Sequence, residues 1–392
     1  MKKFLAVVLA AVMVLGVAAC SSKTDDNTAD TKTEQDAAND AVEASGVALE
    51  DLKVGFVHIS DPSDMGYTYN HDLGTQEMVK NLGLSEDQVI NKYNIGEDAS
   101  CDTALRELVE AGCQIIFATS FGFEDYVLAV AAEYPEVQFC HATGYKAAGS
   151  GLSNVHNYFV SIYEARYLAG IAAGLKTKTN KLGYVAAFPF AEVISGYTAF
   201  YLGAKRANPD VTMDVMYTNS WNDPTVEAQV AKALIDGGCD VISQHSDSTA
   251  PATTAEANGV WQVGYNSDMI SAAPNASLVS ARADWGIYVT YAVQCVLNGE
   301  TIPVDWCKGL ADGAVYLSPL NEAIIAEGTE EAIDEAKAEI IAGTNHVFDG
   351  PLKGVNADGK EINLAEGEFF AESSEASAPS WDYIIDGINV IK

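Results

Sequence analysis

An acid, a glycine and two aromatic residues lie close together in the sequence, and these residue types suit the binding of a flat molecule with polar edges. They are Asp64, Gly66, Tyr67 and Tyr69. An aromatic ring can stack on such a ligand, and a carboxylate can accept hydrogen bonds from its N–H groups. A second interpretation is equally open, in which these residues begin a helix and the tyrosines only pack.

No pattern for catalysis, phosphate binding or zinc binding accompanies these residues. The glycine-rich phosphate-binding patterns, the GxSxG pattern of hydrolases and the HExxH pattern of zinc proteases do not occur. Serine, histidine and acidic residues are numerous enough for a discontinuous catalytic triad, but none is marked as a nucleophile. The sequence therefore predicts a binding protein that performs no catalysis and uses no cofactor or metal.

The loop that contains these residues is positioned by a predicted strand over 53–60 and a predicted helix over 69–82. Such a unit opens a doubly wound parallel sheet, in which ligands lie beyond the carboxyl ends of the strands. Two similar series of strands and helices predict two α/β lobes with a cleft between them. Further strands are predicted over residues 89–93, 114–120, 137–141, 154–159, 181–186, 213–218, 240–244, 261–264 and 277–280. Further helices are predicted over residues 102–111, 161–176, 193–207, 224–235, 285–297 and 330–341.

The N-terminus carries the features of an exported lipoprotein. Lys2 and Lys3 precede an apolar segment over 4–17, which is short for a membrane span. Small residues then lead to Cys20, and this order resembles the bacterial lipobox. The resemblance implies cleavage before Cys20 and lipidation of its sulfur, and the two acyl chains of a diacylglyceryl group would give stable anchoring. The alternative is an ordinary signal peptide with a chance cysteine.

Charge and cysteine content narrow the partners further. The 392-residue chain has 22 Lys and Arg against 55 Asp and Glu, a formal net charge of -33. Nucleic-acid binding needs a basic face, so this composition argues against such a partner. The spacing of the cysteines after Cys20 predicts no particular disulfide pairing. These cysteines are Cys101, Cys113, Cys140, Cys239, Cys295 and Cys307.

Several motifs together resemble the basic membrane protein (BMP) family, the substrate-binding lipoproteins of ABC importers. The motifs include TSFGFED at 119–125, EARYLAGIAAG at 164–174, GYVAAFPFAEVISG at 183–196, and QHSDS at 244–248. The similarity extends over essentially all of residues 53–392. It implies a type I periplasmic-binding-protein fold, an α/β architecture of two Rossmann-like lobes that are joined by a three-strand hinge around a ligand cleft. One branch of the family, represented by purine nucleoside receptor A, binds purine nucleosides.

The resemblance also implies which residues hold the ligand. The base-stacking aromatics of the nucleoside-binding branch fall on Tyr67 and Trp221, so a purine would be clamped between one ring from each lobe. The alternative is that Tyr67 packs within its helix and that Trp221 is a buried tryptophan on a lobe face.

This sequence departs from the branch where the branch holds ribose. An Asp-Ser-Asp segment becomes Asn266-Ser267-Asp268, a lysine is replaced by the segment around Arg282, and a Gly-Gly turn becomes a segment with Asp247. Loss of an acid and a lysine removes charge-assisted hydrogen bonds to the sugar. Asp247 adds a carboxylate that could accept a purine N–H. We therefore expect a purine base, such as adenine, in preference to a nucleoside, unless Arg282 replaces the lysine.

Four further residues are candidates for the ligand site with weaker support. Phe123 follows a predicted strand and, with Phe121, could form a wall of the cleft, although core packing is an equal alternative. Asp64 could face the ligand or cap the first helix, and Tyr265 could line the cleft beside Asn266. Asp268 is a candidate because it matches the second acid of the Asp-Ser-Asp segment in the nucleoside-binding branch.

These inferences predict a lipid-anchored protein on the extracytoplasmic face of the cell membrane. It would capture a purine as a monomer and deliver it to the permease and ATPase subunits of an ABC importer. We expect a signal peptide over 1–19, a lipidated Cys20 with a disordered acidic tether over 20–50, an N-terminal lobe over 51–158 plus about 282–304, and a C-terminal lobe over 159–281 plus about 305–392. Alternatives are another flat heterocycle such as riboflavin, a sensor that reports to a membrane receptor, and a nucleoside hydrolase.

Overall fold

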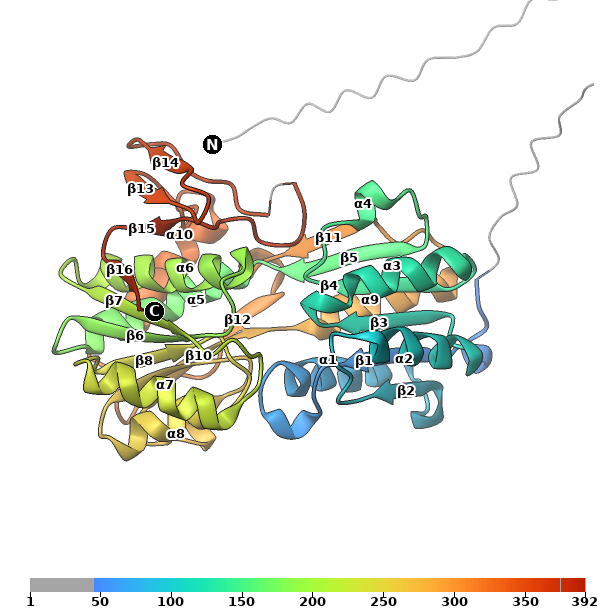
Figure 1. Cartoon of the computed structure of the whole chain (residues 1–392), viewed down its shortest axis with the longest axis horizontal. Helices are drawn as coiled ribbons and strands as arrows, with labels where there is room; N and C mark the ends of the chain where they lie inside the picture. The colour runs from blue at the N-terminus through green and yellow to red at the C-terminus, as the bar shows by residue number, and fades with distance from the viewer. Residues whose placement is uncertain (1–45, 374, 392) are drawn as a thin grey trace, which may run out of the picture. The chain divides into compact units, whose positions relative to one another are not determined.

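Parallel strands and helices alternate along the chain, as the sequence predicts. The computed structural model describes residues 46–373 and 375–391 (Figure 1). The strand predicted over 181–186 is β6, Lys181–Ala186, and the helix predicted over 224–235 is α7, Pro224–Asp236. The signal peptide, Cys20 and almost all of the predicted tether lie outside the described residues.

The N-terminal lobe is built on a six-stranded parallel sheet with the strand order β11-β5-β4-β3-β1-β2. Because side chains alternate along each strand, Phe56 faces the core beneath α1 and α9, while Val57 faces the core beneath α2 and α3. The strands are β1 Val54–His58, β2 Val89–Lys92, β3 Ile115–Thr119, β4 Gln138–Ala142, β5 Val155–Val160 and β11 Asp305–Lys308. The helices are α1 Tyr67–Leu82, α2 Ala99–Glu110, α3 Glu124–Glu133, the short α4 Ala147–Ser150 and α9 Trp285–Asn298.

The C-terminal lobe has a seven-stranded sheet with the order β12-β10-β9-β8-β6-β7-β16, in which only β12 runs antiparallel to its neighbour. Helices α5 and α6 cover one face, and α7 and α8 cover the other (Figure 1). The remaining strands are β7 Thr212–Tyr217, β8 Val241–Gln244, β9 Trp261–Tyr265, β10 Ser277–Ala283, β12 Val315–Leu317 and β16 Ile388–Val390. The remaining helices are α5 Ile162–Lys176, α6 Ala191–Ala207, α8 Ala250–Ala257 and α10 Thr329–Ile341.

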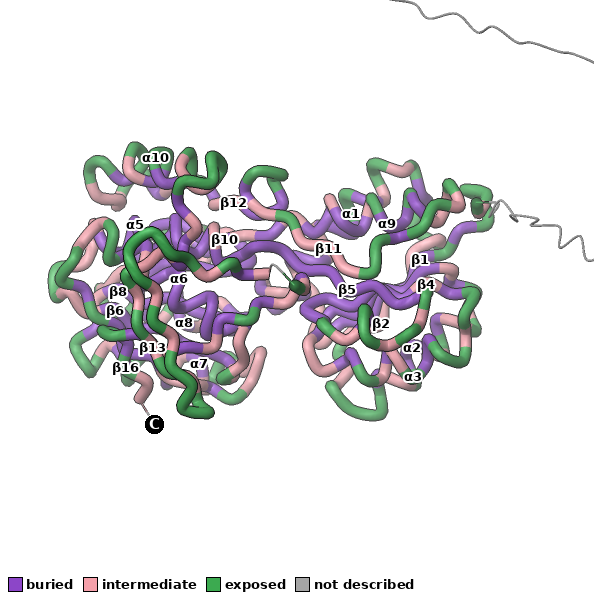
Figure 2. Tube along the Cα trace, turned by 90° about the horizontal axis from the view of Figure 1, so that it is seen from above, coloured by how far each residue is buried: buried purple, intermediate pink, exposed green. Residues whose placement is uncertain are grey.

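Both sheets form the buried interior of their lobes. Figure 2 shows their strands as largely buried, with exposed residues concentrated in the surrounding helices and loops. Five of the six described cysteines are buried, and all six are free thiols. Among the residues that the structure describes, no helix is both long enough and apolar enough to cross a bilayer.

The described chain passes between the two sheets three times, from β5 to α5, from β10 to α9 and from β11 to β12. Sequence analysis assigned residues from about 305 onward to the C-terminal lobe. However, β11 pairs with β5, so this four-residue strand belongs to the N-terminal sheet. Such a short edge strand offers too few residues for a recognisable alternating pattern, which explains the difference.

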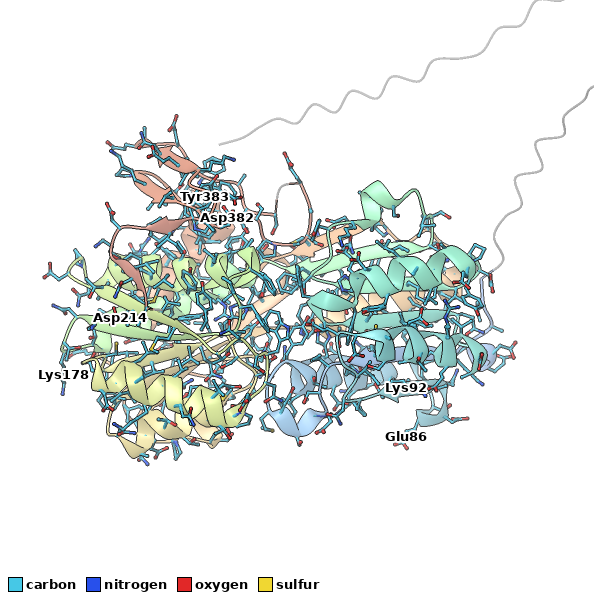
Figure 3. All side chains as sticks on the ribbon, in the orientation of Figure 1. Glu86, Lys92, Lys178, Asp214, Asp382 and Tyr383 are labelled. Carbon is cyan, nitrogen blue, oxygen red and sulfur yellow. The ribbon has the colours of Figure 1, made fainter. Side chains whose placement is uncertain are left out.

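The C-terminal segment adds a small sheet and one edge strand. β13 Leu352–Val355 pairs with β14 Glu361–Leu364 and with β15 Ile384–Ile385, while β16 extends the large sheet beside β7. Asp214 of β7, labelled in Figure 3, holds this addition in place. Its carboxylate accepts a hydrogen bond from Asn389 Nδ2 at 3.0 Å and lies 2.7 Å from Lys181 Nζ.

Candidate functional site

A cavity lined by residues of both lobes lies between them, at the carboxyl ends of their parallel strands. Ser120 directly follows β3, Thr143 follows β4, and His245 follows β8. This is the edge at which parallel α/β sheets bind ligands. The N-terminal lobe contributes Ile59, Tyr67, Ser120, Phe121, Thr143 and Phe159 to the lining. The C-terminal lobe contributes Glu192, Trp221, His245, Asp247 and Tyr265.

Tyr67 is positioned by the start of α1. The Asp64 carboxylate accepts hydrogen bonds from the backbone N–H groups of Gly66, Thr68 and Tyr69 at 2.8–3.0 Å. The first N–H groups of a helix have no carbonyl partner within the helix, so Asp64 acts as an N-terminal cap. The Tyr67 ring is supported from behind by His71, at a centroid distance of 4.5 Å. Tyr67 therefore reaches the cavity from a rigid helix end.

Trp221 is positioned between β7 and α7 in the opposite lobe. The next helix begins at Pro224, and Asp223 caps it by accepting the N–H groups of Thr225 and Val226. The Trp221 ring packs edge to face against Phe188 at 5.0 Å. A planar ligand that entered the cavity would meet an aromatic side chain from each lobe.

A second group of aromatic residues joins the lobes beside the cavity. Phe190, which precedes α6, stacks on Phe121 of the N-terminal lobe with 4.9 Å between ring centroids. Phe188 stacks in turn on Phe190 at 5.3 Å. This aromatic cluster continues to Trp221, and two of its members, Phe121 and Trp221, line the cavity.

A histidine and two acids provide the polar part of the lining. His245 Nε2 lies 2.7 Å from Glu192 Oε1 in a buried contact. Burial lowers the pKa of His245, so its ring is neutral near pH 7. With the proton on Nε2 and donated to Glu192, Nδ1 remains an acceptor. This atom has no hydrogen-bond partner among the described residues.

Asp247 is the second acid, and its side chain is almost fully buried. Burial raises the pKa of its carboxyl well above the ordinary value, and the nearby charges of Asp64, Glu227 and Glu192 raise it further, while the Tyr67 backbone N–H lowers it. Its Oδ1 accepts a hydrogen bond from Asn266 Nδ2 at 3.1 Å. The carboxyl is thus held in one orientation in an environment that disfavours its charge.

The Trp221 indole also offers an unused polar atom. Its Nε1 is buried and has no hydrogen-bond partner within the described part of the chain. Leaving a buried donor unpaired costs about 1–3 kcal/mol. Two residues of the lining, Trp221 and His245, thus carry a buried nitrogen without a partner in the described part of the chain. His245 Nδ1 lies beside Gly196 of α6, where a Cβ atom would be 3.0 Å away.

A buried arginine lies beneath the polar lining. The guanidinium carbon of Arg166 is 3.8 Å from the centre of the Tyr265 ring, and Nη1 donates to Tyr184 Oη and to the Gln244 carbonyl oxygen. Arg166 is not among the residues that line the cavity. It packs on the Tyr265 ring and places positive charge near His245.

The structure places four of the predicted ligand residues at the cavity wall: Tyr67, Trp221, Asp247 and Tyr265. Asn266 lies behind Asp247 and orients its carboxyl. Whether these residues touch a ligand stays a prediction.

Three predicted residues lie elsewhere, each for an identifiable reason. Phe123 is fully buried in the core beneath α2 and α3, because the 3₁₀ turn Phe121–Phe123 directs only Phe121 toward the cavity. Asp64 is engaged as the cap of α1. Asp268 accepts the N–H of Ile270 at 3.1 Å and caps a short 3₁₀ turn.

Arg282 does not take the place of the lysine in the cavity lining. Its Nε donates to the Asn266 carbonyl oxygen at 2.9 Å, and its guanidinium carbon lies 5.2 Å from the centre of the Tyr316 ring.

Sequence analysis did not propose Glu192, His245, Ser120, Thr143, Phe159 or Ile59 as ligand residues. Position relative to the strands could have indicated Ser120, Thr143 and His245, since each is the first residue after a strand. Glu192 lies in the first turn of α6, six positions beyond β6, and the sequence has no feature that marks it. Within the described residues, no group of three or more His, Cys, Asp or Glu side chains has the arrangement of a metal site.

Comparison with known proteins relates the chain to bacterial and archaeal solute-binding proteins. Residues 52–346 match the family model described as "ABC transporter substrate-binding protein PnrA-like". A purine-binding protein of Brucella abortus is 38% identical over 80% of this chain and 87% of its own length. A putative ABC transporter glucose-binding protein of Haloferax volcanii is 32% identical over 84% of this chain and 82% of its own length.

A solved structure supports the fold independently. An ABC transporter solute-binding protein of Aeropyrum pernix superimposes with a TM-score of 0.64 at 19% identity, over 78% of this chain and 93% of that chain. This likeness confirms the predicted two-lobed α/β fold.

Proposed function

The chain belongs to the Bmp family of PnrA-like ABC transporter substrate-binding proteins, and on this premise we propose that it captures a purine base for import. The base would lie between Tyr67 and Trp221 and would be read by Asp247, Glu192 and His245. The protein would release it unchanged to a permease that is driven by an ATPase.

One observation carries this proposal: an aromatic ring from each lobe and hydrogen-bonding groups of both kinds line a single cavity. A purine base matches that lining, because its two faces can stack and its edge carries both N–H donors and ring nitrogen acceptors. Stacking between two lobes also makes binding favour the closed arrangement, since a single open lobe offers only one of the rings.

The preference for a base over a nucleoside rests on the positions where the family resemblance locates ribose contacts. Arg282 is bound to the Asn266 carbonyl oxygen, and Asp268 caps a turn, so neither lines the cavity. A sugar would add hydroxyl groups without gaining a charged partner from these two residues. This arrangement supports the base, because a site gains selectivity for a substrate hydroxyl only by pairing with it.

Thermal unfolding of the secreted part, residues 21–392, tests the proposal with adenine, adenosine, riboflavin and glucose. At a concentration of about 100 times its dissociation constant, a ligand stabilises the folded protein by about 2.7 kcal/mol, which corresponds to several degrees in Tm. We expect adenine to raise Tm more than adenosine and glucose to leave it unchanged. A larger shift with adenosine would refute the preference for the base, and a shift with glucose alone would refute a purine ligand.

The location and partners follow from the same premise. ABC substrate-binding proteins act outside the cytoplasm, and we propose that Cys20 carries the lipid that holds this one at the membrane as a monomer. Mass spectrometry of the membrane-bound protein would show a diacylglyceryl group on Cys20, and an unmodified Cys20 would exclude the anchor. Genes for a permease and an ATPase beside this gene would favour import over a sensor role.

A further inference from the structure

The two lobes approach each other closely at Gly66, the residue that precedes α1. A Cβ atom at this position would lie 2.2 Å from the Asp247 carbonyl oxygen and 2.7 Å from the Asp247 Cα. Cβ atoms in proteins essentially never make contacts shorter than 3.0 Å. Because the opposing atoms belong to the backbone, no side-chain rotation at Asp247 would relieve the overlap.

Neighbouring residues make direct contacts across the same boundary. Ser267 Oγ donates a hydrogen bond to the Met65 carbonyl oxygen, and Asn222 Nδ2 donates to Ser60 Oγ at 3.1 Å. Gly66 thus lies at the centre of a docking surface in which residues 60–67 of the N-terminal lobe meet the loops of the C-terminal lobe. The structure therefore shows the lobes in their closed arrangement.

In each lobe, the docking surface is directly linked to an aromatic residue of the cavity lining. Asp247, whose backbone meets Gly66, donates its N–H to the Trp221 carbonyl oxygen at 2.9 Å. Tyr67 is the next residue after Gly66. The two rings proposed to stack on the ligand are therefore brought to their observed separation only when Gly66 and Asp247 can touch.

We propose that Gly66 is the residue that permits closure: its missing side chain allows α1 to reach Asp247 and so determines ligand affinity without contacting the ligand. The inference rests on the proposed function, since it requires a ligand that binds between the lobes. A methyl group at residue 66 would hold the lobes apart, so the ligand would contact one lobe well and the other poorly.

A second glycine provides a matched control. A Cβ atom on Gly149, in the short helix α4, would have no other atom within 4 Å. Gly149→Ala therefore adds the same methyl group in open space. Gly74 is unsuitable, because its Cβ would lie 2.8 Å from the Trp285 Cβ inside the N-terminal lobe and would disturb the fold.

The experiment compares wild type, Gly66→Ala and Gly149→Ala by Tm without ligand, by calorimetric titration with adenine, and by small-angle X-ray scattering with and without adenine. We expect Gly66→Ala to keep the wild-type Tm, to bind adenine at least tenfold more weakly, and to lose the decrease in radius of gyration that adenine causes in wild type. Gly149→Ala should match wild type in all three measurements.

Two results would overturn the inference. The first is wild-type affinity and compaction in Gly66→Ala. The second is a pair of results: Gly66→Ala has a clearly lower Tm than wild type without ligand, and Ser267→Ala binds adenine with wild-type affinity. That combination would show that Gly66 serves the folding of α1 and that the docking surface does not affect binding. If wild type binds glucose instead of adenine, the purine proposal fails, while the same comparison with glucose still decides the role of Gly66.

Discussion

Replacing Trp221 with alanine is expected to weaken the binding of adenine by about 30- to 150-fold. Stacking of a base on an aromatic side chain is worth about 1–3 kcal/mol by alanine substitution, and the truncation also removes apolar surface from the cavity wall. A loss of about 2–3 kcal/mol corresponds to this range, since each 1.4 kcal/mol is a factor of ten. Calorimetric titration of the variant measures the effect directly.

Two controls separate stacking from a general loss of structure. Trp261 lies at the amino end of β9, away from the cavity lining, so Trp261→Ala should retain wild-type affinity. Trp221→Phe should recover most of the lost affinity, because phenylalanine keeps a stacking face but lacks the indole N–H. If Trp221→Ala binds adenine within threefold of wild type, Trp221 is not a stacking residue.

Replacing Asp247 with asparagine is expected to weaken adenine binding by about 10- to 150-fold and to stabilise the unliganded protein. Leaving a buried hydrogen-bonding group of the ligand unpaired costs about 1–3 kcal/mol, and the asparagine amide would turn a donor toward ligand N–H groups. In the unliganded protein, by contrast, the change removes a buried acid that lies near Asp64, Glu227 and Glu192. Asn266 can still donate to the asparagine oxygen, so packing is preserved.

The stabilising effect should depend on pH in a defined direction. The pKa of Asp247 is higher in the folded protein than in the unfolded chain, so the folded state keeps its proton at pH values where the unfolded state has lost it. Folding is therefore favoured at low pH, and this contribution is lost as pH rises through the folded pKa. Asp247→Asn has no such group, so its Tm should exceed that of wild type at pH 8 and approach it at pH 4.

A surface acid provides the comparison for this variant. Asp125 is on α3 and pairs with Lys146 in an exposed contact, so Asp125→Asn should change neither affinity nor the pH dependence of Tm appreciably. The other acids around the cavity are present in both proteins, so the difference in Tm reports Asp247 together with its interactions with Asp64, Glu227 and Glu192. A Tm for Asp247→Asn that is lower than wild type at pH 8 would contradict the unfavourable burial of this carboxyl.

The fold could be predicted because hydrophobic periodicity marks the long buried elements clearly. The strand over 181–186 was found at the observed residues, and the helix predicted over 224–235 begins at the observed residue. β11 was missed, since four residues of an edge strand carry little pattern and its pairing with β5 depends on tertiary contact. The helix α8 was not predicted, because its alanine-rich sequence has only eight residues and shows no clear apolar periodicity.

The candidate site could be predicted only in part, because it is assembled from many loops. Family resemblance indicated Tyr67, Trp221 and Asp247, and these line one cavity. Phe121 and Phe123 could both have formed the cleft wall, and only Phe121 does, because the direction of a single turn decides this and the sequence does not reveal it. Glu192 and His245 come together from α6 and the end of β8, and no local pattern records such a meeting.

The most direct test of a purine base enclosed between the lobes is a crystal structure of the protein grown with adenine. The ring is expected between Tyr67 and Trp221, with its polar edge within hydrogen-bond distance of Asp247 and His245, and with Gly66 against the Asp247 backbone. Adenine bound outside this cavity, or on one lobe while Gly66 and Asp247 remain apart, would contradict the proposed site and its closure.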